Sequence, residues 1–240
     1  MAQPVTQKIS VNVEPNQTEW ESMPIPNVSN LITEDDTPVD NLISEKQQRL
    51  LTVSLYSSLE GDVPFLAAAN VGLFYAAHQP PLVPDILLSL GISSSQDLSQ
   101  KQNRSYFVWN FGKPPEVVIE IVSNKVGNEL GSKLTDYAHA GVAYYVVFDP
   151  LQCLGDKILS VYELRATQYR LLDDYWLDDI QLGLTLWQGK FEGCEYSWLR
   201  WCDRKGNILL TGDEKAEQEK QRAERLAEIL RSQGIDPDRL

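Results

Sequence analysis

"PPEVVIEIVSNKVGNELGSKLTDYAHAGVAYYVVFDP", residues Pro114–Pro150, contains two apolar runs separated by a helix-like segment. The Val117–Val122 run is almost entirely Val and Ile, which is typical of a central strand buried on both faces. One apolar helix face then follows at the spacing i, i+4, i+7, i+8, formed by Leu130, Leu134, Tyr137 and Ala138. Gly141 ends this helix, and "AYYVVFDP" reads as another buried strand. The stretch therefore predicts a strand–helix–strand unit.

Glu120 is the exception inside the first of these strands. A carboxylate in a buried strand loses its hydration, so it needs a partner or a function. One alternative is a structural ion pair with Lys133 or Arg104, because buried charges are normally paired. The other alternative is a carboxylate placed for chemistry.

The segments on either side extend this unit into an α/β fold. Ser44 and Gln47 match a capping box, and leucines at helical spacing continue to Gly61. Two strand-like runs follow, "PFLAAANVGLFYAA" and "LVPDILLSLG", and "YFVWNFGKPP" then approaches the Glu120 strand. The predicted order is helix, strand, strand, strand, helix, strand, which gives an αβββαβ core with a mixed sheet.

The ends of the chain have a different texture. Residues 1–43 are predicted to form a flexible, acidic arm, because they are rich in Pro, Asn, Thr and acids. Residues 44–211 are predicted to form the main domain, extended by β-hairpins after Lys157. Residues 212–240 are predicted to form a charged C-terminal helix with only a thin apolar seam. Removing the chain from Asp213 onward is therefore expected to leave the domain folded.

Composition restricts the functional classes. No apolar run approaches the roughly 20 residues needed to span a bilayer, and the three cysteines lack metal-site or disulfide spacing. These features predict a cytoplasmic protein with reduced thiols and no membrane partner. The net charge of −13 disfavours tight binding to nucleic acid. Residues 97–133, however, carry five basic and four acidic side chains, so a weakly bound polyanion remains compatible.

Asp85, Glu120 and Lys133 together fit phosphodiester hydrolysis. This reaction needs a hard divalent cation held by oxygen ligands and a nearby positive charge that assists the attacking water. Asp85 and Glu120 lie in neighbouring apolar strand runs, and the main-chain carbonyl of Ile121 is a candidate third ligand. Carboxylate and carbonyl ligands favour Mg²⁺ or Mn²⁺ over zinc.

Pro84-Asp85, the "EIVS" that begins at Glu120, and "ELGSKLTDYAHAGVAYYVVFDP" resemble the Uma-type restriction endonuclease family of the PD-(D/E)XK nuclease superfamily. The resemblance implies a restriction-endonuclease-like fold, DNA as substrate, Asp85 and Glu120 as metal ligands, and Lys133 as the catalytic lysine. It also implies a weaker role for Glu45 as an additional carboxylate. Ser123 and Tyr137 are further candidates beside the site. The lysine of the superfamily pattern is replaced by Val122, so Lys133 must come from the following helix.

Two functions from different classes therefore compete. The Asp85, Glu120 and Lys133 set favours a metal-dependent DNA endonuclease. The acidic charge and the absence of a lysine at position 122 favour a catalytically weak binding or scaffold protein. Such a protein would keep the nuclease fold and associate through its C-terminal helix, giving a homo-oligomer.

Overall fold

The computed structural model describes residues 41–59, 61, 63–76, 79–93, 97–100, 103–124 and 128–237. The predicted flexible arm over residues 1–43 falls almost wholly outside this part of the chain. All elements below belong to the described residues.

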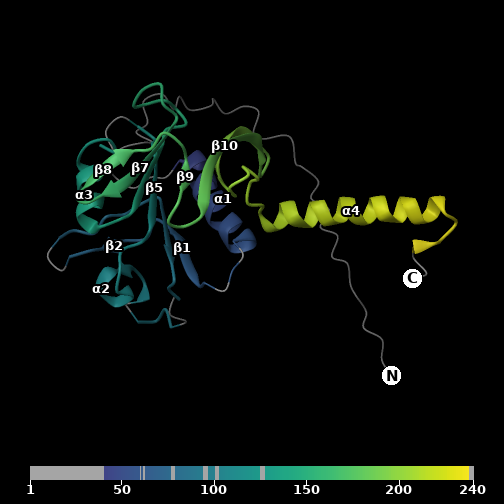
Figure 1. Ribbon diagram of the computed structural model, residues 1–240, viewed down its shortest axis with the longest axis horizontal. Helices are drawn as coiled ribbons and strands as arrows, with labels where there is room; N and C mark the ends of the chain where they lie inside the picture. The colour runs from purple at the N-terminus through teal and green to yellow at the C-terminus, as the bar shows by residue number, and fades with distance from the viewer. Residues whose placement is uncertain are drawn as a thin grey trace, which may run out of the picture. The chain divides into compact units, whose positions relative to one another are not determined.

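A mixed six-stranded sheet forms the centre of the fold (Figure 1). Its strand order is β1-β3-β5-β6-β7-β8, and β5 and β6 are parallel whereas the other neighbours are antiparallel. The strands are β1 (Phe65–Ala69), β3 (Ile86–Leu90), β5 (Val117–Ile121), β6 (Tyr144–Phe148), β7 (Leu159–Arg165) and β8 (Gln168–Leu171). With helices α1 (Leu42–Ser58) and α3 (Ser132–Ala140), the chain order α1-β1-β3-β5-α3-β6 confirms the predicted α/β core.

Smaller elements surround this sheet. A two-stranded sheet is formed by β2 (Leu73–Phe74) and β4 (Tyr106–Phe107). A three-stranded sheet is formed by β9 (Trp176–Leu177), β10 (Leu182–Phe191) and β11 (Cys194–Cys202). The β7–β8 hairpin extends the six-stranded sheet and confirms the predicted hairpin extension. The long β10–β11 hairpin belongs to the separate three-stranded sheet. A short helix, α2 (Val108–Phe111), was not predicted.

Three predicted boundaries are corrected. Helix α1 begins earlier than Ser44, because the Asn41 side chain caps it by accepting from the backbone N–H groups of Ile43 and Ser44. The predicted strand "PFLAAANVGLFYAA" is divided into β1 and β2 at Asn70, which has a positive φ of 52°. Helix α3 begins at Ser132, so Leu130 of the predicted apolar helix face lies before the helix.

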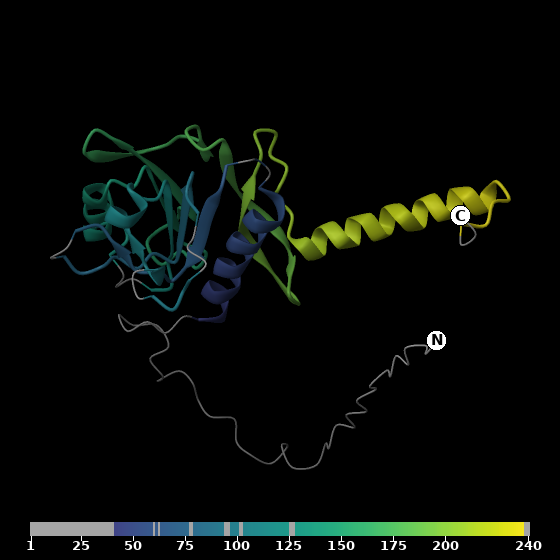
Figure 2. The same cartoon turned by 90° about the horizontal axis from the view of Figure 1, so that it is seen from below.

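The two faces of the sheet carry separate cores. On the α1 face, alternate residues such as Ile86 and Ile119 pack with Leu51 and Leu55 of α1 and with the β9–β11 sheet. Buried Gln47 of α1 fixes this contact, since its amide exchanges hydrogen bonds of 2.9 Å with the backbone of Leu199 in β11. Figure 2 shows α1 beside these hairpin strands. On the α3 face, Val118 and Val122 pack with Tyr137 and Ala140. Glu120 lies between Val118 and Val122 in the strand, so its side chain points to the α3 face.

Helix α4 (Gly212–Ser232) carries no buried residue of its own. Its start is nevertheless tied to the domain by polar contacts. Thr211 and Glu214 form a capping box, Glu214 pairs with fully buried Arg200 through two contacts of 2.7 and 2.9 Å, and Lys215 donates to the Ser57 carbonyl. The expectation that the chain can end before Asp213 without loss is therefore revised. Within the described residues, no hydrogen bond or ion pair joins the later turns of α4 to the domain.

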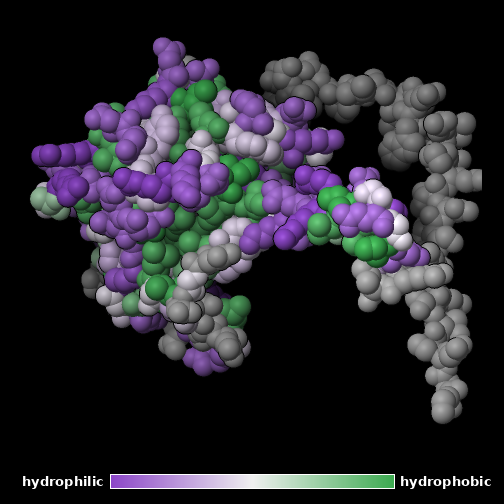
Figure 3. All heavy atoms as spheres, turned by 45° about the vertical axis from the view of Figure 1, so that its right-hand side comes forward, coloured by the Kyte–Doolittle hydropathy of each residue, from purple (hydrophilic) through white to green (hydrophobic). Residues whose placement is uncertain are grey.

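The surface of α4 is largely hydrophilic, with hydrophobic side chains gathered toward its C-terminal end (Figure 3). Leu226 and Ile229 are each 53% exposed there. None of the helices in the described part of the chain has the length and hydrophobicity that crossing a membrane would require.

Candidate active site

Asp85 and Glu120 meet where β3 begins and β5 ends. The two strands are antiparallel and place Ile86 opposite Ile119, so Asp85 is the next position toward Glu120. Asp85 is held there by the backbone, because its Oδ2 accepts a 2.6 Å hydrogen bond from the N–H of Ile121. The strand register therefore brings the two carboxylates to one end of the sheet.

Gln48 of α1 holds the other oxygen of Asp85. Its Nε2 donates to Asp85 Oδ1 at 2.7 Å, and its Oε1 accepts from Asn70 Nδ2 at 3.1 Å. Asn70 also bonds to the Asp85 carbonyl through its backbone N–H at 3.2 Å. Both Asp85 oxygens are thus oriented before any ligand arrives.

Glu120 is only 3% exposed, and two residues of α3 face it. Lys133 Nζ lies 3.0 Å from its Oε2, and the Tyr137 hydroxyl donates to its Oε1 at 2.5 Å. Burial raises the pKa of Glu120 to about 7, Lys133 opposes this rise, and the negative charge of Asp85 adds to it. A further positive charge beside Glu120 would therefore stabilise its ionised form.

Lys133 is shared between two carboxylates. Besides Glu120, its Nζ lies 3.4 Å from Oε1 of Glu129, which is four residues earlier in the chain. Burial disfavours the lysine charge, but the Glu120 and Glu129 carboxylates outweigh burial and raise the pKa of Lys133. Lys133 consequently remains a cation beside Glu120 at neutral pH.

Glu129 is unusual among these groups. The residue is only 6% exposed, and its buried Oε2 has no hydrogen-bond partner among the residues that the structure describes. A buried carboxylate oxygen with no partner costs free energy, so its retention requires a reason beyond packing. The contact of its Oε1 with Lys133 gives such a reason, because Glu129 can hold the lysine in place.

The donor set fits a hard cation that keeps several of its own water ligands. Among the described residues, no three His, Cys, Asp or Glu side chains come together as a metal cage. Two carboxylates are the protein ligands that Mg²⁺ typically uses, because it is usually bound by one or two carboxylates plus substrate phosphates. Repulsion between Asp85 and Glu120 is the kind of strain that a cation relieves.

A family model described as "Putative restriction endonuclease", Uma2, matches residues 5–186 of the 240. The chain belongs to the Uma2 family. A solved structure from Anabaena variabilis, described as a "putative nuclease belonging to DUF820", is similar at 14% identity with a TM-score of 0.40. The match covers 57% of this chain and 71% of that one. No curated protein matches the sequence.

The Uma2 chain brings together most, but not all, of the residues singled out in the sequence. Asp85, Glu120, Lys133 and Tyr137 form one connected group. Ile121 ends β5 beside it. Glu45 is not connected to this group by a hydrogen bond among the described residues: its side chain is about half exposed and pairs with Arg49 on α1, and its role stays a prediction.

Ser123 and Arg104 have other partners in this Uma2 protein. The Ser123 carbonyl is 4.0 Å from Cys153 Sγ, and its hydroxyl accepts from Asn124 at 3.4 Å. Arg104 bonds to the Leu98 and Ser99 carbonyls, so among the described residues Lys133 is the cation that Glu120 contacts. Trp198 and Trp201 of β11 are almost fully buried.

Three residues of the group were missed in the sequence: Gln48, Asn70 and Glu129. A Gln on a helix and an Asn in a loop carry no pattern that distinguishes them from solvent-exposed residues. Glu129 did offer a signal, since it lies four residues before Lys133, the spacing at which helical side chains meet.

Proposed function

We propose that this protein is a divalent-cation-dependent endonuclease that hydrolyses DNA phosphodiester bonds, with Mg²⁺ or Mn²⁺ as cofactor. The observation that carries the proposal is the juxtaposition of Asp85 and Glu120, with Lys133 within hydrogen-bond distance of Glu120. Membership of the Uma2 family supports a nuclease. DNA would be the substrate, bound weakly because the chain is acidic.

Each residue has a role in this proposal. Asp85, Glu120 and the Ile121 carbonyl would hold the cation, which on binding would neutralise phosphate charge and make water a better nucleophile. Gln48 keeps Asp85 in its rotamer, and Tyr137 does the same for Glu120. Lys133 would stabilise the negative charge that develops on the phosphate and orient the attacking water.

The first test measures the metal response of folding. Without metal, Glu120→Gln is expected to melt at or slightly above the wild-type temperature, because it removes a buried charge that Asp85 repels. Gln can keep both contacts, accepting from Lys133 and donating to the Tyr137 hydroxyl. With Mg²⁺, wild type should gain thermal stability through binding to the native state, whereas Glu120→Gln should gain little. Melts with EDTA and with Mg²⁺ provide the readout.

Glu192→Gln is the matched control, because it removes an exposed carboxylate that pairs with Lys46 and Arg49 far along the chain. It should keep the full Mg²⁺ response. The 3.0 Å contact with Lys133 is also what a purely structural role for Glu120 predicts. In that case Glu120→Gln would melt well below wild type without metal and still respond to Mg²⁺, which would refute the proposed metal site.

A second prediction concerns Glu129, which we propose as a positioning residue for Lys133. When a cation occupies Glu120, Glu129 would remain as the anionic partner of Lys133 at 3.4 Å. Glu129→Gln is expected to lower the turnover number by about tenfold, because a displaced lysine contributes less to stabilising charge. The Mg²⁺ concentration for half-maximal activity should not change. If Glu129→Gln shifts that concentration instead, the residue acts on the metal; if activity falls only in proportion to folded protein, its role is structural.

The second candidate function is a nuclease-fold scaffold that self-associates through α4. The exposure of Leu226 and Ile229 on that helix favours it. A plasmid-nicking assay with Mg²⁺ or Mn²⁺, together with light scattering on the intact chain, separates the two. Nicking that is lost in Glu120→Gln supports the endonuclease, and a stable oligomer without nicking supports the scaffold.

A further inference from the structure

The segment Tyr106–Phe111, "YFVWNF", carries four aromatic side chains in six residues. On one side of it Phe107 stacks on Phe74 of β2, with ring centroids 4.7 Å apart, and also contacts Trp109 at 5.2 Å. Phe74, Phe107 and Trp109 are called the aromatic cluster below. Trp109 is 53% exposed, and α2, which carries it, has no buried residue. Core packing therefore does not account for this tryptophan.

The aromatic cluster lies close to the candidate active site along the chain. Leu73, which precedes Phe74, exchanges backbone hydrogen bonds of 2.7 and 3.0 Å with Leu82. Asp85 follows Leu82 by three residues, so their Cα atoms are at most about 11 Å apart. These hydrogen bonds tie the β2 part of the cluster to the segment that leads into Asp85.

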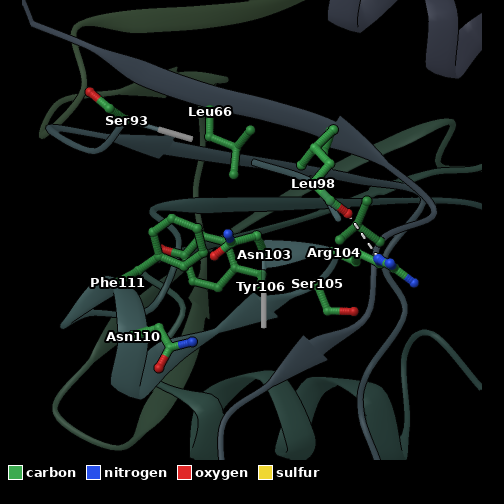
Figure 4. A pocket seen from close by; sticks show the side chains of 11 residues that line it. Leu66, Ser93, Leu98, Asn103, Arg104, Ser105, Tyr106, Asn110 and Phe111 are labelled. Carbon is green, nitrogen blue, oxygen red and sulfur yellow. Dashed lines mark hydrogen bonds between the residues drawn. The ribbon is translucent and has the colours of Figure 1, made fainter. Parts of the chain in front are cut away.

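The opposite side of the same segment faces a cavity of about 620 Å³. Tyr106 and Phe111 stack with centroids 4.5 Å apart and wall the cavity together with Leu66 and Leu98 (Figure 4). Asn103, Ser105 and Asn110 add polar groups to this lining. An apolar cavity with a few amides and hydroxyls, in this size range, is typical of a site for a small planar group.

Unpaired nucleic-acid bases fit these features better than duplex DNA does. Base faces are hidden in a duplex, whereas single strands expose them for stacking on aromatic side chains. The acidic chain, with a net charge of −13, can gain little from phosphate contacts, so stacking would have to supply affinity. A second protein copy would also cover an exposed tryptophan, but it would not explain the adjacent cavity with amide groups.

We propose that the Tyr106–Phe111 segment binds unpaired bases of the nucleic-acid substrate, with the aromatic cluster as the stacking surface. The substrate class is then single-stranded or locally unpaired DNA. This inference rests on the proposed nuclease function, which it narrows from DNA in general to DNA with accessible bases.

The test is a binding experiment without cleavage. Anisotropy of a fluorescent single-stranded oligonucleotide is measured in EDTA at low salt with the full-length wild type, Trp109→Ala and Leu171→Ala. Leu171 is 50% exposed on β8, so its variant controls for loss of a large exposed side chain. Trp109→Ala should bind about 5- to 100-fold more weakly, as expected for one lost stacking contact, and Leu171→Ala should bind like wild type.

A second ligand, an oligonucleotide with consecutive abasic positions, turns this comparison into a double-mutant cycle between the tryptophan and the bases. Wild type should lose a similar factor on this ligand, and Trp109→Ala should lose little more, because both changes remove the same contact. Three results would each overturn the inference: equal binding by wild type and Trp109→Ala, equal binding of a matched duplex by wild type, or no oligonucleotide binding. A change of oligomeric state in Trp109→Ala with unchanged binding would make the cluster an interface between copies.

Cleavage assays separate this inference from the proposed function. Base-dependent binding without any Mg²⁺-dependent cleavage would leave the inference standing and remove the endonuclease. Efficient cleavage of duplex DNA that is unaffected by Trp109→Ala would support the endonuclease and overturn the inference about unpaired bases.

Discussion

Lys133→Met is expected to lower the rate of DNA cleavage by about 10²–10³-fold, the usual loss when one stabiliser of developing charge is removed. Its Nζ lies 3.0 Å from Glu120, on the side of the carboxylate that α3 covers, and its side chain remains about one-third exposed. This position allows it to face a phosphate held at the same carboxylate. Methionine preserves the apolar stem and removes only the charge, so the domain should stay folded.

The thermal response to Mg²⁺ should survive in Lys133→Met, because the lysine is proposed to act on water and phosphate and not on the cation. Lys46→Met is the control, since it removes a surface lysine that pairs with Glu192. Cleavage by Lys133→Met at the wild-type rate would exclude the lysine from the mechanism. Cleavage restored in Lys133→Arg would show that the positive charge carries the effect.

Glu120 could be identified from the sequence because the signal lies within one strand. A single carboxylate in a run of Val and Ile contradicts the solvation rule for that run, and the contradiction is visible without any long-range contact. The structure shows how the buried carboxylate is accommodated: Glu120 lies on the α3 face, where Lys133 and Tyr137 contact it. Val122 packs in the core on that same face, so a lysine there would be buried.

Gln48 and Asn70 could not be identified in the same way. Each becomes significant only when α1, the β1–β2 loop and Asp85 come together, over sequence separations of 22 and 37 residues for the two contacts of Gln48. The local sequence pattern around each residue contains no information about these long-range contacts. The start of α1 was misplaced for a related reason: Ser44 and Asn41 are both good caps, and the observed hydrogen bonds select Asn41.

A chain that ends at Gly212 is expected to lose about 3–5 kcal/mol of unfolding free energy, whereas a chain that ends at Gln221 should lose almost none. The two truncations differ in whether they keep Glu214. This residue is the negatively charged partner of Arg200, whose side chain is fully buried. The shorter chain leaves this guanidinium with the Leu209 carbonyl and the face of Trp187, neither of which carries a negative charge.

The longer truncation keeps the capping box of Thr211 and Glu214, the ion pair of Glu214 with Arg200 and the Lys215 contact with Ser57, so the polar contacts that tie the start of α4 to the described part of the domain are retained. Thermal melts of both truncations and of full-length Glu214→Ala provide the comparison, and the shorter truncation should melt on the order of 10 °C below the longer one. Glu214→Ala should resemble the shorter truncation, because it creates the same unpaired Arg200. If both truncations melt with the full-length chain, the ion pair contributes little, and α4 can be removed anywhere without consequence for the nuclease domain.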